Sequence, residues 1–357
     1  MENDRITSHK LNFHPDRVAK WMDTREEYPI NAEIAISGAC NHRCIFCSAD
    51  YMKYVPTFLT RDLMRERMKE MHELGLKSVL LAGNGEPLVN KDAVYIINDM
   101  KDIGLDVALS TNGVLLTKEK AEKCMSALSW IRFSVSAGTE ETYKKIHRGK
   151  DGDLLRLFHN IEDAVQIKRI RNLSTILNVQ IVMTPDNVDE VITLAKKVKE
   201  LGADRYILKS VGWLPNTESN LRNTIDRERF YNEHQNIEKK LLKLNDDNFE
   251  CVYRFDRINK LGKKRDYYEC LASVFHVCID SNGNVLPCCE FMGISEMAYG
   301  NINTQSFSEI WAGDTRKKIL HDLKQSNLKN CPEDCRLDNM NRYLQELINP
   351  GNHVNFI

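Results

Sequence analysis

Cys40-Asn41-His42-Arg43-Cys44-Ile45-Phe46-Cys47 is the stretch around which the rest of the chain is organised. Its three cysteines stand at C-x3-C-x2-C spacing, which is too tight to span two secondary-structure elements. We therefore expect the thiols of Cys40, Cys44 and Cys47 to lie on one loop and to converge on one centre. Thiolates grouped in this way favour an iron–sulfur cluster, zinc or copper(I). A closed zinc site needs a fourth ligand, which His42 could supply, whereas a 4Fe-4S cluster on three cysteines keeps one iron open.

The segments around this loop alternate between strand and helix patterns. Residues 32–37 place Ile34 and Ile36 on one face, which predicts a strand that leads into the cysteine loop. Six strands alternating with helices predict an α/β fold with a parallel sheet, in the form of a partial (β/α)6 barrel. Parallel barrels gather their functional residues at the C-terminal ends of the strands, where this loop would lie. The other predicted strands are 78–82, 106–111, 130–136, 175–183 and 205–211, and the predicted helices are 61–74, 91–103, 117–127, 153–169 and 188–201.

Composition narrows the class of protein. The chain has 357 residues, a formal net charge of −1 and 11 cysteines. It has no long apolar run and no secretory signal, so we expect a cytoplasmic protein without a nucleic-acid or membrane partner. Cysteines in a reducing compartment indicate metal chemistry rather than disulfides.

Polar motifs follow the predicted strands. Gly83-Asn84-Gly85-Glu86-Pro87 follows the second strand, and its glycines would let the backbone approach a ligand closely. Ser110-Thr111-Asn112-Gly113 ends the third strand, where hydroxyl and amide groups suit a ribose or a carboxylate. Ser134-Val135-Ser136 ends the fourth strand, and Arg148 follows soon after. Each motif could instead be an ordinary turn, and Arg148 could form a surface ion pair.

A second group of cysteines lies near the end of the chain. Residues 277–288 predict a β-hairpin with an Asn-Gly turn at Asn282-Gly283. Four thiols from three places could close around one centre. The six cysteines of this region are Cys270, Cys278, Cys288, Cys289, Cys331 and Cys335.

These motifs resemble the signature of the radical S-adenosylmethionine (radical SAM) enzymes. In that family the three cysteines hold a 4Fe-4S cluster whose free iron binds S-adenosylmethionine, and an aromatic residue, here Phe46, precedes the last cysteine. The Gly-Asn-Gly-Glu-Pro segment resembles the family's Gly-Gly-Glu-Pro, with Asn84 as a departure. The resemblance implies a reductive cleavage that yields a 5′-deoxyadenosyl radical. The cofactor-binding residues that it implies are Phe46, Gly85, Glu86, Ser110, Asn112, Ser136 and Arg148.

The cysteine-rich tail resembles the SPASM and shorter twitch domains, which hold auxiliary clusters. The set is smaller than a full SPASM pattern, so we expect one auxiliary 4Fe-4S cluster, with Cys278 as an alternative ligand and structural zinc as an alternative metal. The expected ligands are Cys270, Cys288, Cys331 and Cys335. The expected divisions are a lead-in at 1–31, without a leader-binding module, the barrel at 32–213, a helical connection at 214–268 and the auxiliary cluster domain at 269–357.

The resemblance leaves the substrate open. We expect an oxidoreductase that oxidises an alcohol of a sugar, amino sugar or cyclitol, perhaps linked to a nucleotide, with the auxiliary cluster as electron acceptor. Lys209, at the end of the sixth strand, is the candidate catalytic residue, with a structural ion pair as its alternative. A flavodoxin or ferredoxin-type protein is the expected reductant. The alternatives are a sugar or peptide epimerase, a maturase of ribosomally made peptides, and a non-catalytic metal-binding protein.

Overall fold

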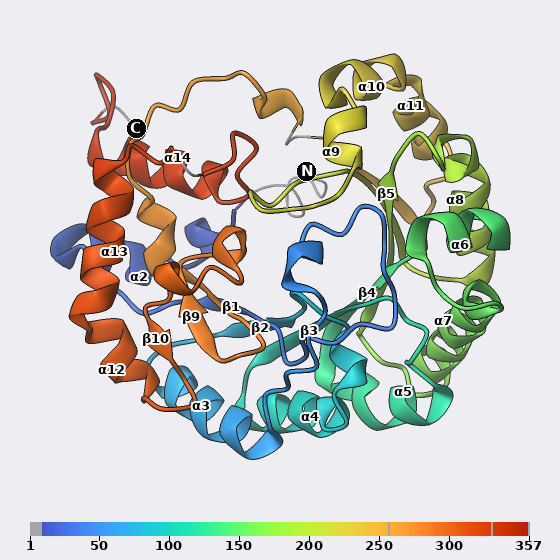
Figure 1. Ribbon diagram of the computed structural model, residues 1–357, viewed down its shortest axis with the longest axis horizontal. Helices are drawn as coiled ribbons and strands as arrows, with labels where there is room; N and C mark the ends of the chain where they lie inside the picture. The colour runs from blue at the N-terminus through green and yellow to red at the C-terminus, as the bar shows by residue number, and fades with distance from the viewer. Residues whose placement is uncertain (1–8, 256–257, 330, 356–357) are drawn as a thin grey trace.

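The computed structural model describes residues 9–255, 258–329 and 331–355 of the chain. Its strands form one curved sheet with helices on the outside (Figure 1). The strand order is β10-β9-β8-β1-β2-β3-β4-β5-β6-β7, so β7 and β10 are the two edges of an open barrel. All pairs from β8 through β1 to β7 are parallel, and only β8–β9 and β9–β10 are antiparallel.

The strand and helix bounds follow the chain. The strands are β1 (Asn31–Ile34), β2 (Ser78–Leu81), β3 (Asp106–Thr111), β4 (Leu128–Ser134), β5 (Ile176–Met183), β6 (Arg205–Ser210), β7 (Glu250–Arg254), β8 (His276–Ile279), β9 (Asn284–Leu286) and β10 (Gly300–Asn301). The helices are α2 (Pro15–Thr24), α3 (Arg61–Glu73), α4 (Ala93–Ile103), α5 (Lys118–Cys124), α6 (Glu140–His147), α7 (Asp153–Ile170), α8 (Val191–Leu201), α9 (Leu221–Thr224), α10 (Arg227–Glu233), α11 (Asn236–Leu242), α12 (Phe307–Ala312), α13 (Asp314–Gln325) and α14 (Asp338–Ile348).

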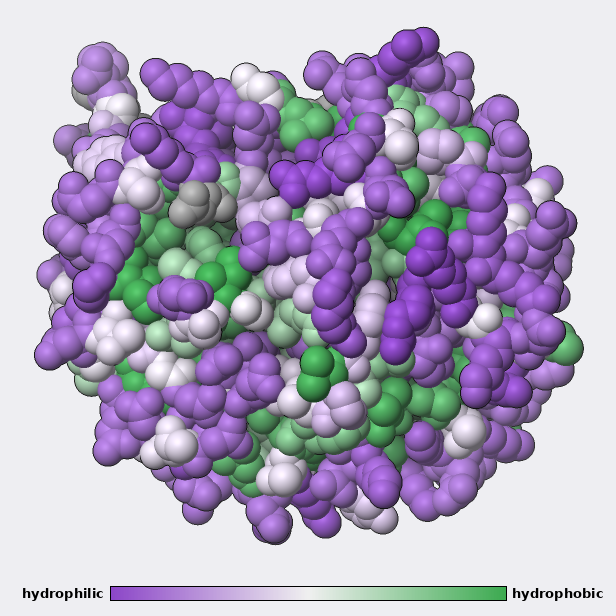
Figure 2. Space-filling model, viewed as in Figure 1, coloured by the Kyte–Doolittle hydropathy of each residue, from purple (hydrophilic) through white to green (hydrophobic). Residues whose placement is uncertain are grey.

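Side chains alternate between the two faces of the sheet, because successive residues of a strand point in opposite directions. In β4, Ile131 and Phe133 are fully buried in the apolar core. Ser134, their neighbour on the other face, lines a cavity inside the barrel. Hydrophilic side chains cover most of the outer rim in Figure 2, and apolar ones show mainly toward the middle of that face. The strands thus hold an apolar core outside the barrel and a polar interior.

Helix boundaries follow local sequence signals. Thr60 caps α3 by accepting a hydrogen bond from the backbone N–H of Leu63, and Gly104 ends α4 in the left-handed conformation. Ser306 and Glu309 form a reciprocal capping box at the start of α12. These signals place the ends of the helices that cover the sheet.

The structure confirms the predicted α/β class and the six parallel strands β1–β6 alternating with helices. Three details differ. The helical connection predicted over 214–268 also contains β7, a seventh parallel strand beside β6. A single helix over 226–244 is wrong, because α10 and α11 are separated at His234. The predicted hairpin forms as β8 and β9, but β8 joins the barrel sheet beside β1 instead of standing apart.

The division of the chain at residues 31, 213 and 268 stays a prediction, and the first eight residues of the lead-in lie outside the described part. Within that part, no helix combines the length and apolar character that crossing a membrane requires.

Candidate functional site

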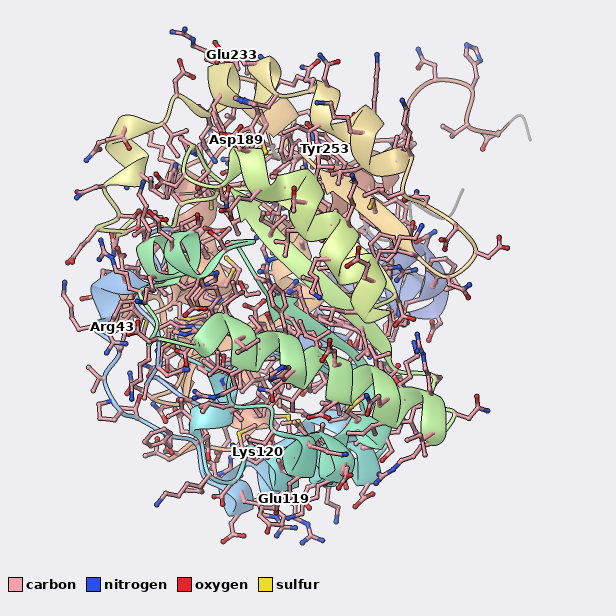
Figure 3. The ribbon with its side chains drawn as sticks, turned by 90° about the vertical axis from the view of Figure 1, so that its right-hand side faces the viewer. Arg43, Glu119, Lys120, Asp189, Glu233 and Tyr253 are labelled. Atoms are coloured by element: carbon pink, nitrogen blue, oxygen red, sulfur yellow. The ribbon has the colours of Figure 1, made fainter. Side chains whose placement is uncertain are left out.

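The cysteine loop follows β1 and is held at the rim of the barrel against the end of α6. The backbone N–H of Arg43 donates to the carbonyl of His147, and that of Ile45 donates to Ile146, at 3.1 and 2.8 Å. Arg43 itself lies at the edge of the molecule near α6 (Figure 3) and covers the ring of Tyr54 at 4.1 Å. The loop conformation is therefore fixed by another element and not only by its own sequence.

The three thiols of the loop are free and lie close together. Burial raises the pKa of the Cys40 thiol to about 12, with the carboxylate of Glu86 and the nearby Cys47 adding to the effect. Cys44 and Cys47 are shifted in the same direction, again chiefly by burial. Three mutually repelling thiolates in a buried place become favourable when a metal centre neutralises them. The donor set thus fits the predicted iron–sulfur cluster, with Cys40, Cys44 and Cys47 as its ligands.

His147 contacts one of these thiols. Its Nε2 accepts a hydrogen bond from the backbone N–H of Ser136 at 2.9 Å. Burial lowers the pKa of His147 to about 3, so the ring is neutral and its single proton sits on Nδ1. Nδ1 lies 3.2 Å from Cys44 Sγ and donates to it. His42 is also buried beside this pair, with its Nε2 3.2 Å from a carboxylate oxygen of Asp153.

The segment after β2 packs directly under the cysteine loop. The backbone N–H of Glu86 donates to the carbonyl of Ala39 at 2.9 Å. A Cβ at Gly85 would lie 2.3 Å from the carbonyl oxygen of Ser37 and 2.5 Å from that of Ala39, so only glycine fits there. Asn84 instead donates to the hydroxyl of Ser281 in the β8–β9 turn, at 3.1 Å.

Glu86 is buried, and both of its carboxylate oxygens accept hydrogen bonds from the end of β3. The hydroxyl of Thr111 and the backbone N–H of Asn112 donate to them at 2.6 and 2.7 Å. The amide of Asn112 in turn donates to Asn41 in the cysteine loop at 2.6 Å. Glu86 and Asn112 thus join the loops after β1, β2 and β3 into one network.

The other residues predicted to bind the cofactor or substrate are spread over several places. Ser110 accepts hydrogen bonds from the guanidinium of Arg132. Ser136 is fully buried, and its hydroxyl accepts from the backbone N–H of Val182. Arg148 lines a surface cavity beside Cys44. Phe46 and Lys209 line a different cavity, inside the barrel. The structure therefore does not bring all of these side chains to one point.

The cavity inside the barrel has a volume of about 270 Å³. Phe46, Cys47 and Ser48 of the cysteine loop form one wall. Cys289, Glu290 and Arg336 from the C-terminal region form another, and the strand ends supply the rest. The wall residues from β4, β5 and β6 include Ser134, Gln180 and Lys209.

The C-terminal cysteines fall into two groups. Burial raises the pKa of the Cys288 thiol well above its usual value, and its electrostatic neighbours include Cys335 and Cys270. Cys331 is shifted to about 12, mainly by burial and then by Cys270 and Cys335. Cys278 lies in β8, where its neighbours are Glu33 and Cys289. The four predicted ligands thus lie together, and Cys278 belongs with the cavity wall.

Sequence reasoning missed several residues of this region. It treated His147 as a surface or packing residue, although its ring is fully buried against Cys44. It also left out Arg132 and Arg336. A signal for Arg132 was available, because a charged residue in the middle of the otherwise apolar strand 130–136 must face a polar interior.

Comparison with known proteins identifies the family. A model of the radical SAM superfamily matches residues 34–227, and a model of the SPASM iron–sulfur cluster-binding domain matches residues 270–336. An AdoMet-dependent heme synthase from Methanosarcina barkeri is 28% identical over 310 residues, which are 81% of this chain and 84% of that protein. A probable GTP 3′,8-cyclase from Methanocaldococcus jannaschii is 29% identical over 185 residues, covering 51% of this chain and only 58% of the cyclase.

Solved structures show the same fold. Streptococcus suis SuiB bound to S-adenosylmethionine superposes with a TM-score of 0.67 at 16% identity, covering 87% of this chain and 72% of that one. Native anSMEcpe with bound AdoMet gives a TM-score of 0.59 at 17% identity, covering 82% and 83%. The cofactors are S-adenosylmethionine and 4Fe-4S clusters. The chain belongs to the radical SAM superfamily and carries a C-terminal SPASM iron–sulfur cluster-binding domain.

Proposed function

We propose that this enzyme oxidises an alcohol of a sugar, amino sugar or cyclitol, and that its auxiliary cluster accepts an electron in the process. The observation that carries this proposal is the cavity inside the barrel, which has the cysteine loop on one side and the C-terminal region on the other. A substrate there lies between the two groups of cysteines. Its volume of about 270 Å³ is near the lower end for small-molecule pockets, which favours a compact substrate.

The residues around the cavity divide the work. When bound, the cluster of the cysteine loop and S-adenosylmethionine supply the radical that takes a hydrogen atom from the alcohol carbon. The substrate then loses the hydroxyl proton and one electron, and a ketone forms. Lys209 and Gln180 contact and orient the substrate from the strand ends. Cys270, Cys288, Cys331 and Cys335 would hold the cluster that receives the electron.

Anaerobic turnover with a panel of sugars, amino sugars and cyclitols tests the proposal. The expected product is two mass units lighter than its substrate and appears with equimolar 5′-deoxyadenosine. Cys40→Ala should abolish both products. An unchanged substrate mass with deuterium gained from solvent would show epimerisation and would overturn the oxidation.

A second candidate is the modification of a peptide. It is supported by the fold similarity to SuiB, whose structure was also solved with its precursor peptide SuiA, and to anSMEcpe with a bound peptide. Incubation with short peptides encoded near the gene, followed by mass spectrometry, would separate the two. A modified peptide together with no reaction of any sugar would favour this second function.

A further inference from the structure

The interior of the barrel carries a cluster of basic side chains that the proposed reaction does not yet explain. We call it the lumen cluster, and it consists of Arg132, Lys209, Arg254 and Arg336. The first three lie on β4, β6 and β7, and the fourth follows Cys335 in the segment before α14.

Strand register places these residues on the interior face. Lys209 pairs with Val182 of β5 on one side and with Arg254 of β7 on the other, so all three point the same way. Lys209 and Arg336 both line the cavity. Arg132 is two residues before Ser134, which also lines it, and therefore faces the same interior.

Few carboxylates accompany these cations. Glu33 on β1 forms an ion pair with Arg336, and Glu290 is the other acidic residue of the cavity wall. Arg132 donates from Nε and Nη2 to the neutral hydroxyl of Ser110, at 3.2 and 3.1 Å. Burial lowers the pKa of Arg132 to about 10. Glu33 opposes this shift, while the positive charges of Arg254 and Arg336 add to it.

Four cations facing two carboxylates in a buried space repel one another, and this repulsion is relieved when an anion binds among them. Guanidinium groups bind carboxylate and phosphate oxygens with paired hydrogen bonds. The carboxylate of S-adenosylmethionine has another predicted partner, Arg148, which lines a separate cavity. The lumen cluster is thus left for the substrate.

We propose that the substrate carries an anionic group, a carboxylate or a phosphate, which binds to the lumen cluster with Lys209 and Arg132 as its main partners. This inference rests on the proposed function only in taking the barrel cavity as the substrate site. The same anion would orient the reacting carbon toward the cysteine loop, because Phe46 and Cys47 form the opposite wall.

Binding to the full-length, anaerobically reconstituted protein in the presence of S-adenosylmethionine tests this proposal without turnover. Glycerol 3-phosphate, glycerate and glycerol serve as probes, since they differ chiefly in the anionic group. Isothermal titration calorimetry should show one of the two anions binding at least about tenfold tighter than glycerol, and the preferred anion identifies the substrate class. Equal binding of glycerol, or no binding of either anion, would overturn the proposal.

Two variants locate the bound anion. Lys209→Gln and Arg132→Gln should each weaken its affinity about tenfold. Lys197→Gln, at an exposed position on α8, should leave it unchanged. If Arg132→Gln does not fold, Lys209→Gln alone decides, and an unchanged affinity in that variant overturns the proposal. Failed alcohol oxidation with intact anion binding would count against the proposed function only.

Discussion

His147 donates a hydrogen bond from Nδ1 to the Sγ of Cys44, across a distance of 3.2 Å. The donor is fixed, because the backbone N–H of Ser136 occupies Nε2 and burial keeps the ring neutral. The ring is further held by stacking on Tyr143, with 4.3 Å between the centroids. A cluster ligand of this enzyme therefore has a preorganised N–H donor that comes from α6 and not from the cysteine loop.

Replacing His147 should shift the reduction potential of the cluster on this loop. An N–H···S bond stabilises the more negative, reduced cluster, so His147→Phe should make the midpoint potential more negative. One lost hydrogen bond of about 1 kcal/mol corresponds to about 40 mV for one electron. Redox titration followed by electron paramagnetic resonance measures the shift. His159→Phe, at an exposed position on α7, is the control. An unchanged potential in an iron-replete His147→Phe protein would contradict this role.

Gly85 sets the spacing between the loop after β2 and the cysteine loop. In Gly85→Ala the new methyl group would meet the backbone oxygens of Ser37 and Ala39 at 2.3 and 2.5 Å, and backbone atoms cannot move aside cheaply. We expect a loss of about 1–3 kcal/mol in the free energy of unfolding, together with poor iron retention. Gly351→Ala, where a Cβ would meet nothing within 4 Å, is the matched control. Full iron loading and unchanged urea unfolding of Gly85→Ala would show that the loops can separate.

Local sequence patterns predicted the frame of this protein well. Strands such as 78–82 are short and apolar, and the cysteine spacing needs no tertiary information. β7 escaped because it lies in a strongly charged segment and is recognised only through its pairing with β6. His147 escaped for a similar reason, since its burial depends on how α6 packs against the cysteine loop. Contacts between distant segments are what a single sequence does not display.

Glu70 joins α3 to the C-terminal region. Its carboxylate accepts hydrogen bonds from the backbone N–H groups of Phe307 and Ser308, at 2.9 and 2.8 Å, at the start of α12. Glu70→Gln should lower the free energy of unfolding at pH 7 by about 1–2 kcal/mol, because one oxygen acceptor becomes a donor. Glu66→Gln, on the exposed side of α3, is the control.

The effect of Glu70 should also depend on pH. Burial acts to raise its pKa, but the hydrogen bonds from Ser308 and Phe307 outweigh burial and lower it from 4.5. A group with a lowered folded-state pKa contributes its full stability above its unfolded value and loses it as the pH falls through the folded value. The difference between wild type and Glu70→Gln in urea unfolding should therefore shrink below about pH 4.5. A difference that grows in acid would contradict this assignment.

The C-terminal cysteines predict a selective loss of iron. Two 4Fe-4S clusters give about eight iron atoms per chain, and removing an auxiliary ligand should cost about four of them. Cys331→Ala should show this loss, because its thiol lies with those of Cys270 and Cys335. Cys278→Ala is the informative comparison, since its thiol lies near Glu33 and Cys289 instead. It should keep all of its iron. Iron analysis of both variants after anaerobic reconstitution makes the measurement, and a loss of four iron atoms in Cys278→Ala would place this cysteine among the ligands.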